Sequence, residues 1–490
     1  MPDDGLGIDA IIGPEVTGKV PIDRRAYDCT MGSLLHDLRS AVGPHHVLTD
    51  ADMVAGYTTD WTGRFTGSTP AVVRPGNTAE VVAVVSVCAA HGATVVPQGG
   101  NTGLVGGGVP LHHEVVLSTR RLIEMGSVDR LSAQVTVGAG VTLAALQQHV
   151  AFSHKRFAVD LGARDSATIG GMAATNAGGI HVIAHGAMRA QVVGVEAVLP
   201  DGSVVSHLGG LLKDNTGYDL SSLLCGSEGT LAVITQLRLR LLGARQQPVV
   251  VAVGHHDLAT LITLVTELRD NTTYLEAAEF VLADGVRLVQ QQLGLEVAPP
   301  MMRPACVLLE LNGGDEAVNA LGRYLPHDGE VAVALNDPRA AHRLWRIREA
   351  HAEAINQLGP PVKLDVTLAL DAITAFLAEL GPALTELKCD AIVFGHLGDG
   401  NLHINVPRHG DDAQRAHSIE DCVLRLVVAH GGTISAEHGI GTAKREWLHL
   451  VRSPAEIRAF RAIKNGLDPQ GLFNPHCLLP EADVHASVAQ

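Results

Sequence analysis

Two histidines flank a turn signal in the segment VFGHLGDGNLHINV, residues 393–406, and imidazoles at this spacing could hold a metal ion. Asp399-Gly400 is typical of the two-residue turn of a β-hairpin. If these two residues form the turn, His396 pairs with His403, and such partners share one face of the sheet with Cβ atoms about 4.5–5.5 Å apart. The alternation of side chains adds Phe394 and Asn405 to the histidine face and turns Leu397, Leu402 and Ile404 toward a core.

A carboxylate and another imidazole follow in SAEHGIG, residues 435–441. Glu437 would supply a third ligand, and His438 would stay free to act as a base. Two histidines and one carboxylate suit zinc, manganese or iron, and we expect zinc first. The alternative is that these are ordinary members of a set of 25 histidines and a surface glutamate. Two facing histidines together with an adjacent Glu-His pair favour the functional interpretation.

Two loops are rich in glycine: PQGGNTGLVGGGVP, residues 97–110, and SATIGGMAATNAGG, residues 166–179. Glycine allows the backbone to approach a ligand closely, and successive N–H groups can form a nest for a diphosphate. Neither loop has the Lys-Ser/Thr of a P-loop, and neither matches the dinucleotide fingerprint of a Rossmann domain. The alternative, two merely tight-turning loops, is less favoured because Thr and Asn donors are interleaved in both.

The elements before these loops can position them. Residues 71–103 predict a strand, a helix and a second strand that leads into the first loop. We expect Asn77 or Thr78 to cap the helix, with Glu80 in its first turn and Gly92 at its end. Further on, QVTVGAG predicts a strand, VTLAALQQHV a helix, and residues 192–207 a hairpin with an Asp201-Gly202 turn. A composition shift near residues 243–248 predicts a second, α+β domain that runs to about residue 440.

Composition excludes several classes of protein. The chain is 46% hydrophobic, enough for a large core, and its formal net charge of −16 with 3% aromatic residues argues against nucleic-acid binding. Seven scattered cysteines without a CxxC pair argue against a disulfide framework or a cysteine-rich metal site, and indicate a reducing compartment. The first residues lack a signal-peptide pattern and no apolar run is long enough to span a bilayer, so we expect a cytoplasmic protein without a membrane span.

The glycine-rich motifs resemble a known family. PxGGxTGLxGG followed by IGGxxATNAGG is similar to the FAD-binding domain of the vanillyl-alcohol oxidase/p-cresol methylhydroxylase flavoproteins, and GSEGTLAVIT, residues 226–235, resembles its closing strand. The first loop has no His or Cys for a covalent tether, so we expect non-covalent FAD. The resemblance implies cofactor contacts at Gly99, Gly100, Asn101, Thr102, Gly103, Ser166, Gly170, Gly171, Ala174, Thr175, Gly178, Gly179, Val233 and Asn474.

The later motifs narrow the resemblance. GHxGDGNxHxN, AEHGIGxxKR and LDPQGLFNP are similar to the FAD-linked D-2-hydroxy acid dehydrogenases, over roughly residues 40–480. The resemblance implies that His396, His403 and Glu437 hold a divalent metal, that His438 is the catalytic base, and that Asn405 touches the substrate. The fold class we expect is α+β, with a two-part FAD-binding domain at 1–243, a substrate (cap) domain with an antiparallel sheet and the metal site at 244–440, and a segment 441–490 that returns to the flavin domain.

Arg348 and Lys363 could bind a carboxylate of the substrate. Arg can hold a carboxylate by two parallel hydrogen bonds, whereas Lys supplies a point charge. In the D-2-hydroxyglutarate enzymes of the family the matching residues bind the distal carboxylate. The alternative is a solvated helix face. Two positions depart from the family pattern: a Thr contact expected one turn after the Arg falls on Ala352, and a Pro expected after KxDxxx is Ala369.

These observations predict an FAD-dependent dehydrogenase that oxidises a D-2-hydroxy acid to the 2-oxo acid, with D-2-hydroxyglutarate favoured over D-lactate. By the resemblance, the metal would chelate the substrate carboxylate and hydroxyl, His438 would take the hydroxyl proton, and hydride would pass to flavin N5. An unidentified acceptor, such as an electron-transfer protein or a quinone, would reoxidise the flavin. Whether the chain forms a homodimer stays an open question. The competing interpretations are a non-haem iron oxygenase and a non-catalytic subunit that binds flavin or metal.

Overall fold

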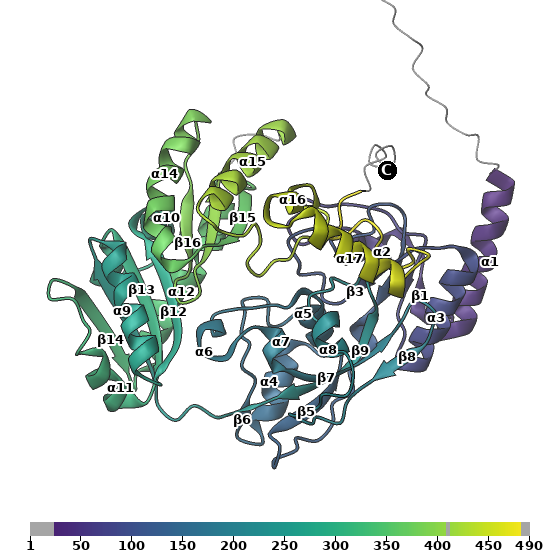
Figure 1. Ribbon diagram of the computed structural model, residues 1–490, viewed down its shortest axis with the longest axis horizontal. Coiled ribbons are helices and arrows are strands. Elements are labelled where there is room, and N and C mark those ends of the chain that lie inside the picture. The colour runs from purple at the N-terminus through teal and green to yellow at the C-terminus, as the bar shows by residue number, and fades with distance from the viewer. Residues whose placement is uncertain (1–23, 408–411, 482–490) are drawn as a thin grey trace, which may run out of the picture.

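The computed structural model describes residues 24–407 and 412–481, and the chain folds into two lobes (Figure 1). The N-terminal lobe comprises residues 24–243 together with the C-terminal segment 441–481. The cap lobe comprises residues 248–440. The two lobes are joined by the linker 244–247, between the end of β10 (Leu242–Gly243) and the start of β11 (Pro248–His255).

The first sheet of the N-terminal lobe has the strand order β1-β2-β4-β3, in which β2, β4 and β3 are parallel. Its helix α3 begins after Asn77, whose side chain accepts a hydrogen bond from the Glu80 N–H, and ends at Gly92 in the left-handed conformation, as the sequence predicts. The elements are α1 (Arg24–Val42), β1 (Val47–Leu48), α2 (Ala51–Thr58), β2 (Val72–Val73), α3 (Thr78–His91), β3 (Val95–Gln98) and β4 (Val115–Ser118).

A second, antiparallel sheet of this lobe has the order β5-β9-β7-β8. The predicted hairpin is present, and its loop spans residues 199–203 with Gly202 at a φ of 82°. The elements are β5 (Gln134–Gly138), α4 (Leu143–Ala151), β6 (Lys155–Arg156), α5 (Ile169–Thr175), α6 (Val182–His185), α7 (Met188–Gln191), β7 (Val192–Val198), β8 (Val204–Ser206), α8 (Leu220–Leu224) and β9 (Val233–Arg240).

The cap lobe is built on one antiparallel sheet of the order β14-β11-β13-β12-β16-β17-β15. Its strands are β11, β12 (Leu275–Leu282), β13 (Ala305–Asn312), β14 (Glu330–Leu335), β15 (Val362–Thr367), β16 (Ile392–His396) and β17 (Asn401–Val406). Its helices are α9 (Leu258–Asn271), α10 (Ala283–Leu293), α11 (Gly314–Leu321), α12 (Pro338–Glu349), α13 (His351–Asn356), α14 (Ile373–Glu386) and α15 (Ala413–Ala429).

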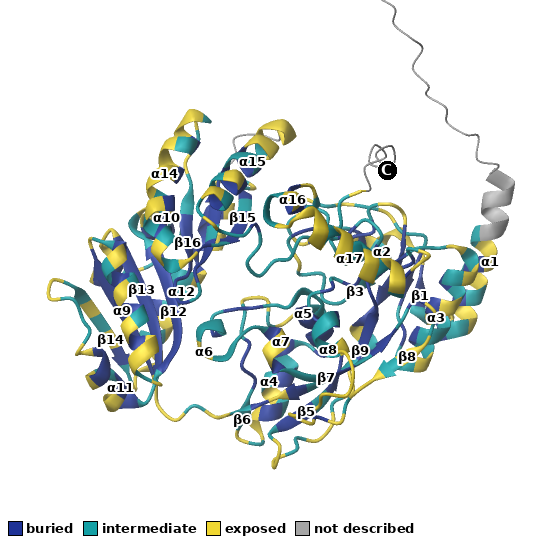
Figure 2. Cartoon of the chain, in the orientation of Figure 1, coloured by how far each residue is buried: buried dark blue, intermediate teal, exposed yellow. Residues whose placement is uncertain are grey.

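Helices cover both faces of the cap sheet, but not equally. One face packs its alternate apolar residues against α9, α11, α14 and α15 along its whole width. On the other face, α10, α12 and α13 form a smaller core that ends at Phe394. Figure 2 shows the buried strands between helices whose outer sides are exposed. Beyond Phe394 this second face carries polar side chains and turns toward the N-terminal lobe.

The C-terminal segment crosses back to the N-terminal lobe. After α16 (Leu448–Val451) and α17 (Pro454–Leu467), Phe473 forms a parallel bridge with Val95 of β3, and the Asn474 N–H donates to the Val95 carbonyl at 2.9 Å. The tail therefore extends the edge of the first sheet.

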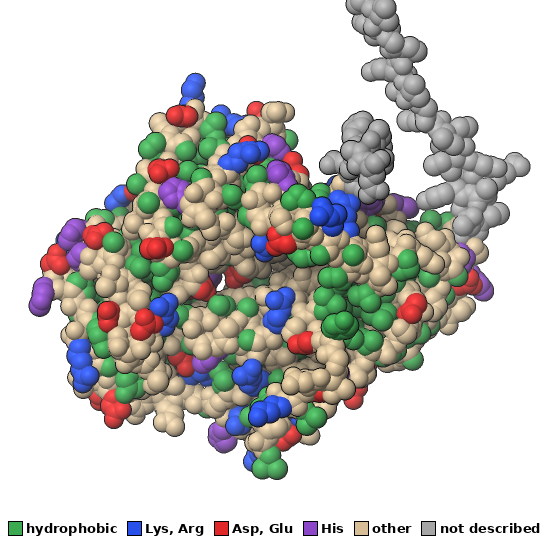
Figure 3. Space-filling model, in the orientation of Figure 1, with side chains coloured by type: hydrophobic (Ala, Val, Ile, Leu, Met, Phe, Trp, Pro, Cys, Tyr) green, Lys and Arg blue, Asp and Glu red, His purple; other side chains and the backbone are tan. Residues whose placement is uncertain are grey.

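The expected α+β class, with an antiparallel cap sheet, is confirmed. Six cysteines lie within the part of the chain whose side chains are described, and each is a free thiol. In the same part of the chain, no helix is both long and apolar enough to cross a bilayer. On the face shown in Figure 3, basic and acidic side chains are interspersed, and no large patch of one sign is seen.

Candidate active site

The two glycine-rich loops pack directly against each other. A Cβ at Gly100 would lie 2.0 Å from the carbonyl oxygen of Ser166, and one at Gly99 would lie 2.3 Å from Oγ1 of Thr168. Thr168 also caps α5, because its side chain accepts the Gly171 N–H. Glycine is thus required at these contacts for a steric reason, and the two loops form one wall.

This wall encloses a cavity of about 360 Å³. Its lining comes from both loops, with the hydroxyl residues Thr102, Thr168 and Thr175 among glycines and apolar side chains, and extends to Glu437 and His438 of the C-terminal half of the chain. Glycine backbones and Thr side chains suit a diphosphate and a flat ring system, so the cavity fits FAD. The residues predicted to bind the cofactor that line it are Gly99, Gly100, Asn101, Thr102, Gly103, Gly170, Gly171, Ala174, Thr175, Gly178 and Val233.

The other three residues predicted to contact the cofactor have supporting positions around this cavity. The Ser166 carbonyl packs on Gly100. The Gly179 N–H donates to Oε2 of Glu437 at 2.9 Å, and its φ of 95° requires glycine. The Asn474 amide donates to the carbonyls of Gly107 and Glu228, at 2.7 Å and 3.0 Å, and so ties the tail to the first glycine loop.

The histidine hairpin differs from the sequence prediction in its register. The loop contains four residues, 397–400, and not two, so His396 pairs with Asn401 and His403 pairs with Phe394. The Asp399 carboxylate accepts the Asn401 N–H, and Gly400 has a φ of 77°, which together fix the longer loop. Because the shift is two residues, each side chain keeps its face. Leu397, Leu402 and Ile404 are buried in the opposite core, as predicted.

The predicted metal ligands converge on one point. Nε2 of His396 lies 3.2 Å from Nε2 of His403, and Oε1 of Glu437 lies 3.7 Å and 3.8 Å from these two atoms. Ligands 2.0–2.1 Å from a tetrahedral ion are about 3.3 Å apart, so this donor set fits a zinc-sized cation. Burial would raise the pKa of the Glu437 carboxyl, but the interaction with His396 and the charge of His403 lower it to about 2, so this ligand is ionised.

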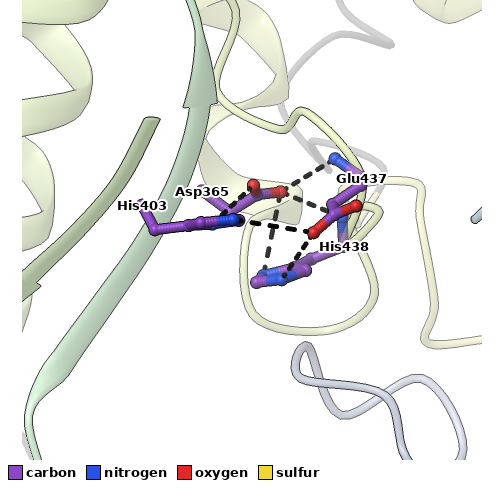
Figure 4. A group of neighbouring side chains, drawn as sticks. All are labelled: Asp365, His403, Glu437 and His438. Atoms are coloured by element: carbon purple, nitrogen blue, oxygen red, sulfur yellow. Dashed lines mark hydrogen bonds and ion pairs between the residues drawn. The ribbon is translucent and has the colours of Figure 1, made fainter. Parts of the chain in front are cut away.

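Asp365, on β15, lies beside these ligands, but both of its carboxylate oxygens already accept hydrogen bonds from other groups of the chain (Figure 4). Its Oδ2 accepts the backbone N–H groups of residues 436, 437 and 438 at 3.2, 2.9 and 2.9 Å. Its Oδ1 accepts from Nδ2 of Asn401 at 2.8 Å and lies 3.5 Å from Nδ1 of His403. Asp365 therefore holds the Glu437–His438 loop and lies beside Nδ1 of His403, and the predicted metal ligands stay His396, His403 and Glu437.

A second buried carboxylate, Glu279 on β12, orients the other histidine. Its Oε1 lies 2.5 Å from Nδ1 of His396, which leaves Nε2 of that imidazole free to face the metal position. Its Oε2 accepts a hydrogen bond from Nε of Arg348 at 2.8 Å and forms an ion pair with Nη2 at 2.7 Å. The guanidinium also lies 4.6 Å from the centre of the Phe394 ring. Arg348 is therefore at the site, but its charge is already matched by Glu279.

Sequence reasoning missed Glu279 and Asp365. Both are fully buried acids within mainly apolar strands, LEAAEFVL and VKLDVT. A buried carboxylate is costly unless it is paired and hydrogen-bonded. An acid in the middle of a predicted core strand was therefore the available signal.

His438 joins the metal position to the cavity. Its ring stacks on that of His403 with 5.9 Å between centroids, and it lines the cavity. Burial lowers the pKa of His438, an effect that the neighbouring carboxylates Asp365 and Glu437 offset only in part. A neutral imidazole at this place can accept a proton at physiological pH.

Lys363 and Asn405 are cross-strand partners. They lie two residues along their strands from the pair of Asp365 and His403, and therefore on the same face of the sheet. Asn405 is buried, and its Nδ2 makes one long contact, 3.4 Å, with the His403 carbonyl. Within the described residues, no carboxylate lies within ion-pair distance of the Lys363 ammonium, which lies 5.0 Å from the ring centre of Trp61. The sheet face thus offers a free cation beyond the metal position.

Comparison with known proteins agrees with this geometry. Residues 69–207 match a family model described as an FAD binding domain, and residues 245–478 match the C-terminal domain of FAD linked oxidases. The chain is 36% identical to the mitochondrial D-2-hydroxyglutarate dehydrogenase of Bos taurus, over 95% of this chain and 88% of that protein. It is 32% identical to a Schizosaccharomyces pombe protein named as a mitochondrial D-lactate dehydrogenase, over 91% and 87% of the two chains.

Among solved structures, p-cresol methylhydroxylase with substrate bound has the same fold. It superposes with a TM-score of 0.73 at 14% identity, over 91% of this chain and 96% of that chain. The match to the FAD binding domain lies in the lobe that carries the glycine-rich wall, and the relatives span both lobes. The chain shares its fold with p-cresol methylhydroxylase and belongs to the family of FAD-linked D-2-hydroxy acid dehydrogenases.

Proposed function

We propose that this protein oxidises D-2-hydroxyglutarate to 2-oxoglutarate with FAD and a divalent metal at His396, His403 and Glu437. Zinc is the favoured metal, ahead of manganese and iron. The observation that carries the proposal is the meeting of three features in one place. Glu437, one of the three converging metal donors, and the His438 imidazole line the cavity that fits FAD, and the His396 and His403 donors lie next to Glu437. The ammonium of Lys363, which has no carboxylate partner in the described part of the chain, lies on the same sheet face, where a second carboxylate would be bound.

The protein's own groups account for the positioning and the proton. FAD held in the glycine-rich cavity would supply a hydride acceptor, and a divalent ion held by His396, His403 and Glu437 would supply a Lewis acid for the substrate hydroxyl. His438 accepts the hydroxyl proton, and its neutral state follows from burial. Asn405 is placed to hydrogen-bond the carboxylate or the hydroxyl at the reacting end. Glu279 and Asp365 keep the histidines in one orientation, which suits second-shell partners of metal ligands.

The choice of a dicarboxylate depends on Lys363 more than on Arg348. Arg348 is neutralised by Glu279, whereas Lys363 has no anionic partner among the described residues. Side chains two residues apart along a strand are separated by about 7 Å. A short dicarboxylic acid can bridge that span between the metal position and Lys363. D-lactate stays the alternative substrate, since one relative is named for it and Ala352 and Ala369 depart from the family pattern.

Anaerobic spectroscopy of the purified protein tests the proposal. D- and L-2-hydroxyglutarate, lactate and malate are added separately, and the visible flavin band is recorded. We expect D-2-hydroxyglutarate to bleach the band most efficiently and its L-form to leave it unchanged. Bleaching by D-lactate alone would shift the proposal to the alternative substrate. A flavin band that no acid bleaches would contradict it and favour a non-catalytic subunit.

The remaining expectations concern partners and location. We propose that an electron-transfer protein or a quinone reoxidises the flavin, because the reduced cofactor must lose two electrons in each turnover. A homodimer and a cytoplasmic location also stay proposals, and the two relatives described above carry mitochondrial names. Light scattering tests the first, and cell fractionation tests the second.

A further inference from the structure

A short turn of the N-terminal lobe, residues 59–66, reaches over the cavity to the cap lobe. Thr59 and Thr66 close it with an isolated antiparallel bridge. The buried carboxylate of Asp60 accepts the Phe65 N–H at 3.0 Å and the Thr62 hydroxyl. The turn therefore has a shape fixed by its own hydrogen bonds, and it does not depend on a ligand to form.

Both lobes hold this turn. The Phe65 ring packs on the first glycine loop so closely that a Cβ at Gly106 would lie 2.9 Å from it. On the other side, Arg64 forms a 2.7 Å ion pair with Glu420 of α15 in the cap lobe. The turn thus connects the wall that fits FAD to the cap lobe.

Trp61 at this turn has no evident part in a core. It is 56% exposed, yet it lines the cavity and lies 5.0 Å from Nζ of Lys363 across the lobe boundary. A large exposed aromatic side chain is a stronger sign of a binding site when it lies beside a cation that has no carboxylate partner among the described residues than when it lies alone on a surface. Its position points to a role in ligand binding and not in folding.

The ammonium that Trp61 contacts has no carboxylate partner among the described residues. Burial lowers the pKa of Lys363, and no described charged group offsets that effect. An indole face stabilises a cation but neutralises no charge. The pair of Trp61 and Lys363 therefore remains open to an anion, in contrast to Arg348.

We propose that Trp61 is a specificity-determining residue that holds the Lys363 ammonium in place and partly free of water, so that the site selects hydroxy acids with a second carboxylate. This inference rests on the proposed function for its reaction. It adds a residue from the flavin-binding lobe to a specificity pocket that otherwise belongs to the cap lobe. The selective pocket is then complete only when the two lobes are joined.

The test compares Trp61→Leu, Trp61→Phe and wild type, with kcat/KM measured for D-2-hydroxyglutarate and D-lactate. We expect Trp61→Leu to lower the preference for the dicarboxylate about tenfold, and Trp61→Phe to lower it about threefold, because Phe is the weaker cation–π partner. Activity with D-lactate should stay near that of wild type. Met53→Ala, which changes a residue 55% exposed on α2 of the same lobe, serves as the matched control and should alter neither activity.

A binding measurement separates this inference from the proposed reaction. The chain contains three tryptophans, so a ligand near Trp61 should change the fluorescence emission. Glutarate, which has two carboxylates and no hydroxyl to oxidise, should change the emission of wild type but not that of Trp61→Leu. Acetate should change neither.

The outcomes decide the two claims separately. If no acid bleaches the flavin, the proposed function fails, and the glutarate titration still decides on Trp61. The inference is overturned if Trp61→Leu lowers both activities equally or leaves the preference unchanged. It is also overturned if glutarate gives wild type and Trp61→Leu the same emission change.

Discussion

At the scale of single residues, two buried carboxylates organise the site. Glu279 holds His396 and Arg348 together, and Asp365 gathers three backbone N–H groups of the Glu437–His438 loop. Neither acid needs to touch the substrate. Each fixes the orientation of an imidazole, so both affect chemistry through the metal position.

Glu279→Gln should lower the affinity for the divalent metal about 10–100-fold, because the partner that orients His396 loses its charge. Competition with a chelator, followed by metal analysis, measures the affinity. Glu353→Gln is the matched control, since Glu353 forms an ion pair of 2.8 Å with Arg346 on the surface. An unchanged metal affinity in Glu279→Gln would exclude this role.

Lys363→Met should lower kcat/KM for D-2-hydroxyglutarate about 10–100-fold, the loss expected for one hydrogen bond to a charged group. D-lactate has no second carboxylate, so its kcat/KM should change little. Steady-state kinetics with a dye acceptor measures both values. Lys213→Met alters an exposed lysine and is the control. Equal losses with both acids would mean that Lys363 acts on the fold or on the reacting end.

At the scale of elements, the sequence predicts which faces the side chains take better than it predicts the register. The alternation of apolar and polar residues in 393–406 is enough to separate the histidine face from the core face. The turn length is not determined by Asp399-Gly400 alone, because Gly400 also packs on the Leu368 carbonyl of a neighbouring segment, where a Cβ would lie 2.1 Å away. A tertiary contact thus sets the four-residue loop.

Helix α13 carries a group whose burial makes stability depend on pH. His351 is fully buried, donates its Nδ1–H to the Ile347 carbonyl, and approaches Gly285 of α10. Burial, together with the charge of Arg348, lowers the pKa of His351 to about 4 from an ordinary value of 6.5. The unfolded chain therefore binds a proton more readily than the folded one, and the stabilisation present above pH 6.5 is lost as the pH falls toward 4.

His351→Gln should remove this pH-dependent contribution to the free energy of unfolding. Between pH 7 and pH 5 the wild type should lose about 2 kcal/mol more free energy of unfolding than the variant. Urea titrations at the two pH values measure the difference. Parallel losses in both proteins would show that His351 is not the group responsible.

At the scale of the whole molecule, a buried carboxylate of the cap lobe forms ion pairs with the N-terminal lobe and the linker. Glu276 of the cap sheet accepts from Arg156 at 2.6 Å and from Arg245 at 3.1 Å, and lies 3.6 Å from Nε2 of His185. These partners come from the N-terminal lobe and the linker. The sequence offered no sign of this cluster, because its members are far apart in the chain and have no local pattern.

Glu276→Ala should destabilise the lobe boundary by about 1–3 kcal/mol, because it removes the carboxylate partner of the partly buried Arg156 guanidinium and one of the two carboxylate partners of Arg245. Thermal unfolding should occur at a lower temperature, and trypsin should cleave faster after Arg245 in the linker. Glu386→Ala, at an exposed position on α14, is the control. Cleavage at the wild-type rate would mean that other contacts hold the lobes together.

The central claim is that the metal position and the FAD cavity form one active site. The most direct measurement is the rate of anaerobic flavin bleaching by D-2-hydroxyglutarate, before and after the metal is removed with a chelator under conditions that retain FAD. We predict that the chelated protein keeps its visible band but bleaches far more slowly, and that added zinc or manganese restores the rate. Bleaching at the original rate without metal would contradict the account.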